Sequence, residues 1–219
     1  MNLFNTHFLS IRTIYKTCLI VVFSLLFLSN AVATEGERLF DEYLSSTRTM
    51  SADFSQTQRS EKGEVLQESS GIFFLDKPGK FRWDYSEPFE QQIISDGNNI
   101  WIYDVELQQV TVQKQSISMK NTPMALIQDK ASVHDAFNVI QLNQLEGVYY
   151  MSLIAKSEQS DFKDITLGVD ENGLRIMKLK DQFDQITDIV FTNVKVNKKI
   201  DKSVFTFEPP QGVDVFGGS

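Results

Sequence analysis

Few side chains in residues 34–219 suit covalent or metal chemistry. This part of the chain contains one histidine, His134, and no cysteine, so it lacks the ligand clusters of zinc and transition-metal sites. It also contains no G-x-S-x-G nucleophile sequence and no Gly-rich phosphate-binding loop. We predict no catalytic residue, no metal and no cofactor, and we interpret His134 as a solvated or helix-end histidine.

The charged residues indicate an acidic surface. Removing residues 1–33 takes away two basic side chains and no acidic one, which changes the net charge from −8 to about −10. Residues such as Glu61, Glu64 and Glu68 favour solvated surface over a paired-acid catalytic site, because acidic side chains are rarely buried. The negative charge argues against nucleic acid as a partner and against adsorption to anionic lipid.

Residues 1–33 have the composition of a cleaved secretory signal peptide. Arg12 and Lys16 precede an apolar run over residues 18–28, and Ala31-Val32-Ala33 supplies a small-x-small cleavage sequence. The apolar run is shorter than the roughly 20 residues that a membrane-spanning helix needs, which disfavours an uncleaved anchor. We therefore predict export.

Cys18 begins the apolar run, whereas the cysteine of a lipobox follows it. We expect Cys18 to leave with the signal segment. The mature chain, residues 34–219, is then one domain that carries neither a lipid anchor nor a disulfide.

Hydrophobic periodicity predicts one helix followed by many strands. The helix is expected over residues 35–46, where apolar residues recur at helical spacing: Leu39, Phe40, Tyr43 and Leu44. Beyond it apolar and polar residues alternate, which is typical of half-buried antiparallel strands. Asp96-Gly97 and Asn172-Gly173 suit tight hairpin turns. About ten or eleven strands result, which indicates a sandwich or a barrel.

Residues 122–137 interrupt the strand pattern. Thr122-Pro123 has the capping hydroxyl and first-turn proline of a helix start, and a second short helix is predicted from Ser132 to Phe137. We expect these apolar helices and the first helix to form a lid over an open barrel end. The predicted lid residues are Leu39, Tyr43, Met124, Leu126 and Ile127.

Aromatic side chains supply the predicted binding site. Neighbouring strands each carry several at a period of two, so that those of one strand share a face. An ordinary barrel core explains such residues, but ten or more strands enclose more space than side chains fill. A hollow with few titratable groups suits acyl chains. The predicted cavity residues are Phe54, Phe81, Trp83, Tyr85, Trp101 and Tyr103.

The chain resembles the outer-membrane lipoprotein carrier protein (LolA-type) family. Four ordered stretches carry the resemblance, at residues 51–56 (SADFSQ), 77–85 (KPGKFRWDY), 95–103 (SDGNNIWIY) and 205–213 (FTFEPPQGV), and Thr122-Pro123-Met124 also fits. Together they span nearly all of the mature domain. The resemblance implies a mainly β fold, a single-domain incomplete antiparallel β-barrel of about eleven strands with short α-helices as a lid over the cavity.

The resemblance also implies a periplasmic carrier without enzymatic activity. Such a carrier binds the acyl chains of lipoproteins released by an inner-membrane ABC-type complex and delivers them to an outer-membrane receptor lipoprotein. We expect a monomer.

Lys77 departs from the family pattern. In the family an arginine directly before the proline hydrogen-bonds the lid helices and keeps the empty cavity closed, so the resemblance implies a lid-latch role for Lys77. Lysine lacks the planar five-donor fork of arginine and cannot clamp several carbonyls at once. We expect a looser closed state, with hydrogen exchange over residues 124–137 that responds to Lys77→Ala.

Four alternatives stay open. In the first alternative, the same fold carries another acylated cargo such as a glycolipid. The sequence does not distinguish this cargo from a lipoprotein, because an acyl-chain cavity does not record the head group. The outer-membrane receptor is disfavoured because no lipobox is present. An esterase requires a nucleophile paired with His134, and a structural envelope protein predicts no release of lipoproteins.

Overall fold

The computed structural model describes residues 34–118, 127, 130–157 and 162–218, which form one β-sheet with short helices. The described strands are β1 (Thr49–Arg59), β2 (Val65–Asp76), β3 (Lys80–Glu87), β4 (Gln91–Asp96), β5 (Asn99–Asp104), β6 (Gln109–Lys114), β7 (Phe137–Leu145), β8 (Val148–Ala155), β9 (Phe162–Asp170), β10 (Gly173–Asp181), β11 (Ile186–Val196) and β12 (Asp214–Gly217). The described helices are α2 (Glu35–Ser46), α3 (Gln115–Ser118), α4 (Lys130–Ala136) and the short 3-10 helix η3 (Lys202–Phe205).

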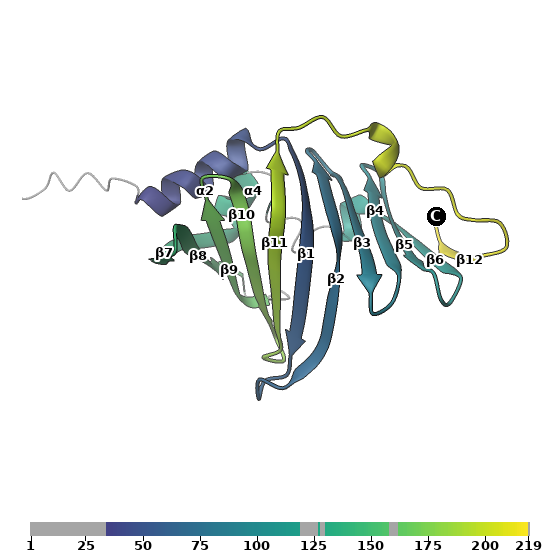
Figure 1. The fold of residues 1–219 in the computed structure, drawn as a ribbon, viewed down its shortest axis with the longest axis horizontal. Coiled ribbons are helices and arrows are strands. Elements are labelled where there is room, and N and C mark those ends of the chain that lie inside the picture. Colours follow the sequence, from purple (N-terminus) through teal and green to yellow (C-terminus); the bar gives the residue numbers. More distant parts are fainter. Residues whose placement is uncertain (1–33, 119–126, 128–129, 158–161, 219) are drawn as a thin grey trace, which may run out of the picture. The chain divides into compact units, whose positions relative to one another are not determined.

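The strands form a single curved, open sheet in the order β12-β6-β5-β4-β3-β2-β1-β11-β10-β9-β8-β7 (Figure 1). Neighbours are antiparallel, except that β12 runs parallel to β6. The described strands therefore leave β12 and β7 as edges, and the predicted mainly β, incomplete barrel is confirmed. In the part of the chain that the structure describes there are twelve strands instead of about eleven. All four residues of β12 are exposed, so no buried side marks this strand in the sequence.

The helix α2 has the bounds that the sequence predicts, because local signals fix both its start and its buried face. Thr34 Oγ1 accepts the Glu37 N–H at 3.3 Å and Glu37 Oε2 accepts the Thr34 N–H at 2.9 Å, which completes a capping box. Phe40, Tyr43 and Leu44 are at most 4% exposed. Their burial against the sheet supplies the stability that a twelve-residue helix lacks in isolation.

Both predicted hairpin turns are also confirmed. Gly97 has a φ of 100° between β4 and β5, and Gly173 has a φ of 116° at the start of β10. Glycine adopts these angles without the steric cost that a Cβ brings. At the first turn Asp96 Oδ1 accepts the backbone N–H groups of Asn98 and Asn99, at 2.7 and 2.8 Å.

The sheet has two faces, which we name by what covers them. The inner face is the one against which α2 packs, since Tyr43 Oη donates to Met50 Sδ (3.7 Å) and the Gly36 N–H donates to Gln141 Oε1 (2.9 Å). The hydrophobic core of the described residues lies on this inner face. The outer face is the opposite one.

The chain that follows β11 covers part of the outer face. Arg82 of β3 alternates with the buried residues Phe81 and Trp83 and donates its Nη1 to the carbonyl oxygen of Val204 in η3, at 3.3 Å. Arg82 therefore lies on the outer face.

The predicted lid falls partly outside the described residues. Thr122-Pro123, Met124 and Leu126 lie there, so the first lid helix stays a prediction. The second helix is present as α4, which begins two residues before Ser132 and contacts α2 and β7. No helix among the described residues is long and apolar enough to cross a membrane.

Candidate ligand-binding site

The middle of the inner face carries a group of aromatic rings, which we call the aromatic layer: Phe54, Phe73, Trp83, Tyr85 and Phe191. They come from the four neighbouring strands β11, β1, β2 and β3. The ring centroid of Trp83 lies 4.8 Å from Phe73, 5.1 Å from Phe54 and 6.1 Å from Phe191. Trp83 therefore stands at the centre of the layer, and it is only 6% exposed.

The strand register and one glycine make this layer possible. Phe54 of β1 lies opposite Gly71 of β2, which lies opposite Tyr85 of β3. A Cβ on Gly71 would overlap the carbonyl oxygen of Asp84 and come within 3.0 Å of Phe54 Cε1. Because no side chain occupies this place, the rings of Phe54 and Tyr85 meet edge to face at 5.1 Å.

Four of the six predicted cavity residues lie on the inner face. Phe54, Phe81 and Trp83 are at most 6% exposed, and Tyr85 is half-buried. Burial raises the pKa of the Tyr85 phenol to about 12, although its hydrogen bond to Gln56 Oε1 (3.2 Å) acts in the opposite direction. Tyr85 is therefore neutral at physiological pH, and these four residues contribute no charge to the inner face.

Trp101 and Tyr103 lie on the outer face, so their prediction as cavity residues is wrong. Trp101 pairs with Ile94, which pairs with the outward-facing Arg82. Both aromatic rings pack against Phe207 with centroid distances of 5.7 Å. Alternation within a strand indicates which residues share a face, but the register with the neighbouring strands decides which face that is.

Sequence reasoning missed Phe73 and Phe191, which are both fully buried. Phe73 belongs to the continuous apolar run 72–75, where alternation is hidden because Phe74 on the outer face is also apolar. Val190 hides Phe191 in the same way, since this valine is apolar and 41% exposed. Pairing with the strand that contains Trp83 was the signal available for Phe73.

The helix α2 covers part of the inner face through the residues predicted for the lid. Tyr43 is 4% exposed, and Leu39 is partly buried and packs against the core. Burial raises the pKa of the Tyr43 phenol, which keeps its proton and donates to Met50. Among the strands, α2 packs mainly against β7, β8, β9 and β10, so it covers the β7 side of the inner face.

Lys77, the predicted latch, contacts the end of α2. Its Nζ donates to the carbonyl oxygen of Leu44 at 3.0 Å and lies 5.4 Å from the ring centroid of Tyr43. The carbonyl groups of a last helical turn lack intrahelical partners and carry partial negative charge, so a cation stabilises them. Lys77 therefore ties the C-terminal end of α2 to the β2–β3 connection.

A second contact joins α4 to α2. His134 Nε2 lies 2.8 Å from Asp41 Oδ1, and Lys156 Nζ donates to the carbonyl oxygen of His134. The side chains of His134 and Asp41 are 42% and 30% exposed, so this pair lies at the surface. His134 thus stands in the last turn of α4, as predicted. Nearby in the chain, the predicted lid residue Ile127 is fully buried in the core.

The inner face changes from aromatic to polar at Tyr85. A pocket of about 400 Å³ begins there and is lined by amide, hydroxyl and carboxyl side chains together with Pro88. Its rim includes Phe89 and Leu107, which are 59% and 65% exposed. The polar lining consists of Gln56, Gln67, Ser69, Gln91, Asp104 and Glu106.

The sequence that forms this sheet matches a family model described as outer membrane lipoprotein carrier protein LolA, over residues 45–208. The chain belongs to this family. An outer-membrane lipoprotein carrier protein of Methylococcus capsulatus is 41% identical over 190 residues, which cover 87% of this chain and 91% of the relative. One from Nitrosospira multiformis is 36% identical over 201 residues, covering 91% and 96%.

A solved structure shares the fold of this carrier-family chain. It is an uncharacterized conserved protein from Thermus thermophilus, with a TM-score of 0.51 over 80% of this chain and 93% of that one. The two sequences are 11% identical, so the likeness concerns the fold alone.

The aromatic layer of this carrier-family chain contains one unpaired polar atom. Trp83 Nε1 is buried and has no hydrogen-bond partner among the described residues. Leaving a buried donor unpaired costs about 1–3 kcal/mol, and most buried donors in folded proteins are paired. This N–H group is therefore an exception to the usual pairing of buried donors.

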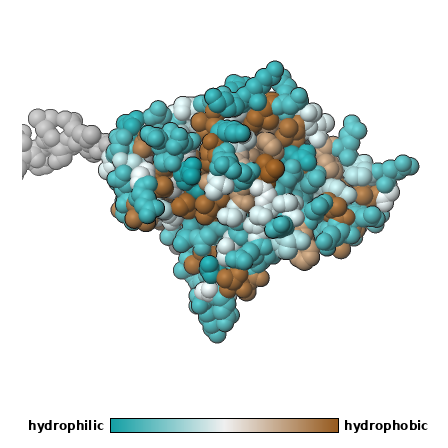
Figure 2. Space-filling view, viewed as in Figure 1, coloured by the Kyte–Doolittle hydropathy of each residue, from teal (hydrophilic) through white to brown (hydrophobic). Residues whose placement is uncertain are grey.

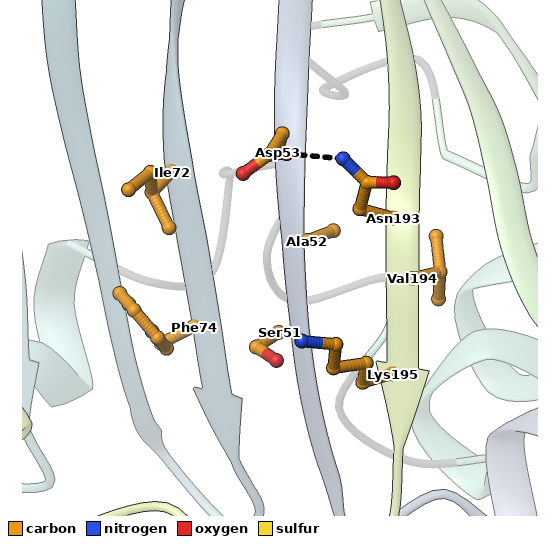
Figure 3. A pocket seen from close by; sticks show the side chains of 8 residues that line it. All are labelled: Ser51, Ala52, Asp53, Ile72, Phe74, Asn193, Val194 and Lys195. Carbon is orange, nitrogen blue, oxygen red and sulfur yellow. Dashed lines mark hydrogen bonds between the residues drawn. The ribbon is translucent and has the colours of Figure 1, made fainter.

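A second pocket, of about 460 Å³, lies on the outer face of this carrier-family chain (Figure 3). It lies where β1 and β11 lose register between Ser51 and Asp53, and Asn193 has a left-handed φ of 51° there. Asn193 Nδ2 donates to Asp53 Oδ2 across the pocket at 2.6 Å. The sheet separates this pocket from the aromatic layer. Figure 2 shows apolar residues among polar ones on the visible surface, and Ile72 at the pocket is 45% exposed.

Proposed function

We propose that this protein is a periplasmic carrier that binds the acyl chains of lipoproteins on its inner face. It receives them from an inner-membrane ABC-type complex and delivers them to an outer-membrane receptor lipoprotein. The observation that carries the proposal is the aromatic layer, buried in the hydrophobic core of the inner face in a chain of the lipoprotein carrier family.

The chemistry of the layer fits a hydrocarbon chain. Its members are aromatic, and the buried residues around it are apolar, including Met50, Leu75 and Met177. Each methylene group that leaves water for such surroundings contributes about 0.8 kcal/mol. Binding of this kind is not covalent, so the cargo leaves again when the receptor offers a better site.

The cover of the site consists of α2, α4 and Ile127 in this proposal. Two polar contacts hold the helices, Lys77 to Leu44 and His134 to Asp41, and both are partly exposed to solvent. Contacts of this kind contribute little individually, so the cover opens without unfolding the sheet. Lys77 acts as the latch in this scheme.

An esterase is the alternative from another class, and the place of His134 argues against it. Its ring contacts a carboxylate on a neighbouring helix at the surface, which is a structural link between α2 and α4. We expect His134→Ala to transfer lipoprotein between membrane fractions at the wild-type rate. A loss of transfer with normal folding would favour the enzyme.

Photo-crosslinking at two tyrosines tests the proposed site. Either Tyr85, on the inner face, or Tyr103, on the outer face, is replaced by p-benzoylphenylalanine, and the protein is incubated with spheroplasts and ATP. We expect released lipoprotein in the supernatant, and a crosslink to its acyl chain from position 85 only. Equal crosslinking from position 103 would place the cargo elsewhere.

Mass spectrometry of the crosslinked product separates the cargo classes. The carrier proposal predicts an acylated peptide, and a glycolipid at position 85 would replace lipoprotein with the other acylated cargo. Absence of any release would contradict the carrier function itself.

A further inference from the structure

The O–H and N–H groups of buried and partly buried aromatic residues differ in whether they make a hydrogen bond. Tyr43 Oη donates to Met50 Sδ, Tyr85 Oη donates to Gln56 Oε1, and Trp101 Nε1 donates to Asp96 Oδ2 at 3.1 Å. Trp83 differs from them because its Nε1 has no partner among the described residues, although the side chain is 94% buried.

The surroundings of Trp83 give it no hydrogen bond among the described residues. The rings of Phe54, Phe73 and Phe191 are hydrocarbon, and the Tyr85 hydroxyl, which donates to Gln56, makes no bond to Trp83 Nε1. Phenylalanine at position 83 would keep an aromatic ring in the layer without burying a donor. The N–H group therefore lowers the stability of the free protein and has a use only when an acceptor enters from outside.

The position of Trp83 along β3 suggests which part of a ligand reaches it. Phe81 lies deeper in the apolar core, and Tyr85, the next inward residue after Trp83, lines the polar pocket of about 400 Å³. An amphiphile whose chain lies among the apolar residues places its first polar group where the lining changes, between Trp83 and Tyr85.

We propose that the indole N–H of Trp83 binds the carbonyl oxygen of the ester or amide linkage that joins an acyl chain to the cargo, an inference that rests on the proposed carrier function. A carbonyl oxygen is a strong acceptor, and a neutral one can enter an apolar site at moderate cost. A carboxylate or phosphate is excluded at this depth, because an unpaired charge is far more costly to bury. Trp83 is thus a positioning residue that fixes how far an acyl chain enters.

The two tryptophans allow the inference to be tested in one spectrum. Each indole N–H of the purified full chain, labelled with nitrogen-15, gives one cross-peak, and Trp101 serves as the internal control because it is already paired with Asp96. The probes are dilauroylglycerol, which has ester carbonyls, its ether-linked counterpart didodecylglycerol, which has none, and N-methyl lauramide for the amide. We expect the Trp83 N–H proton to move downfield with the ester and the amide and not with the ether.

Affinity measurements with variants complete the test. We expect the wild type to bind the diester roughly fivefold to tenfold more tightly than the diether, the effect of one neutral hydrogen bond made by an otherwise unpaired donor. Trp83→Phe should lose this preference, so that its affinities for diester and diether become similar whatever their absolute values, and Trp101→Phe should keep it. If Trp83→Phe folds poorly, benzothienylalanine at position 83 replaces the N–H by sulfur in a ring of the same shape.

The possible outcomes separate the inference from the carrier function. Equal affinity for diester and diether, or a Trp83 proton that is already hydrogen-bonded in the free protein and does not move, overturns the inference while binding itself stands. Binding of none of the three probes contradicts the acyl-carrier function. A diester shift without an amide shift assigns the site to ester linkages.

Discussion

The strands β3 to β5 carry aromatic side chains on both faces, and the two sets have different surroundings. On the inner face Trp83 is enclosed by rings from neighbouring strands and its N–H is unpaired. On the outer face Trp101 donates its N–H to Asp96 and packs against Phe207. The same residue type therefore has its hydrogen bond on one face and lacks it on the other, which is where we propose that a ligand binds. The outer cluster of Trp101, Tyr103 and Phe207 packs the chain that follows β11 against the sheet.

The largest difference between the two faces should appear when each of two adjacent residues of β2 is replaced by alanine and the loss of stability is compared. Phe73 on the inner face is fully buried, whereas Phe74 on the outer face is half-buried beside the second pocket. We expect Phe73→Ala to lower the free energy of unfolding by about 3–5 kcal/mol, because it leaves a cavity in the core. Phe74→Ala should cost less than half as much, as measured by urea denaturation. Equal losses would contradict the distinction between the two faces.

A smaller loss of stability is expected from a substitution in the outer cluster. Phe207 packs against both Trp101 and Tyr103, so Phe207→Ala should lower the free energy of unfolding by about 2 kcal/mol. Phe216→Ala is the matched control, since Phe216 of β12 is 52% exposed and its loss should change stability by about 0.5 kcal/mol or less. Lipoprotein release per folded molecule should be unchanged in Phe207→Ala, and a lost release activity would assign cargo to the outer face.

The outer cluster should also respond to acid through Asp96. Burial raises the pKa of this carboxyl, but hydrogen bonds from Asn99, Asn98 and Trp101 outweigh it, and the net pKa lies below the ordinary value. Asp96→Ala should therefore cost about 1–2 kcal/mol at neutral pH. A lowered folded-state pKa stabilises the fold above the unfolded value of about 3.9. The difference between wild type and variant should thus shrink as the pH falls below about 4, and a constant difference would contradict this account.

The smallest loss of stability is expected from a substitution at the contact between the cover and the sheet. Lys77→Met removes the hydrogen bond to Leu44 and should lower stability by about 1 kcal/mol. Amide hydrogen exchange in the last turn of α2 should accelerate more than exchange in β1. Lys114→Met, at an exposed lysine, is the control. Unchanged exchange in α2 would show that Lys77 does not hold the helix.

Local signals explain what the sequence predicts well. The bounds of α2 follow from its capping box and the spacing of its apolar residues, and the Asp96-Gly97 turn follows from residues within a few positions. The face of Trp101 depends instead on the register across several strands. That register shifts at irregular points such as Ser70/Gly71, which no pattern within one strand announces.

The same limit applies to the site. Phe81, Trp83 and Tyr85 could be grouped from one strand, but Phe73 comes from the neighbouring strand β2 and Phe191 from β11, which is distant in sequence. The unpaired state of Trp83 Nε1 is a property of all of these neighbours together. It becomes visible only in three dimensions.

The centre of the sheet has a consequence for how the chain reaches its folded state. β1, the first strand, pairs with β11, one of the last, so that Phe54 lies opposite Phe191. Contacts between residues far apart in sequence form slowly, because a long loop must close first. Until β11 is available, the half-built sheet exposes its aromatic side to water, and exposed apolar surface of this kind aggregates. We therefore expect the chain to need protection, during synthesis and transit, for the same surface that we propose binds its cargo.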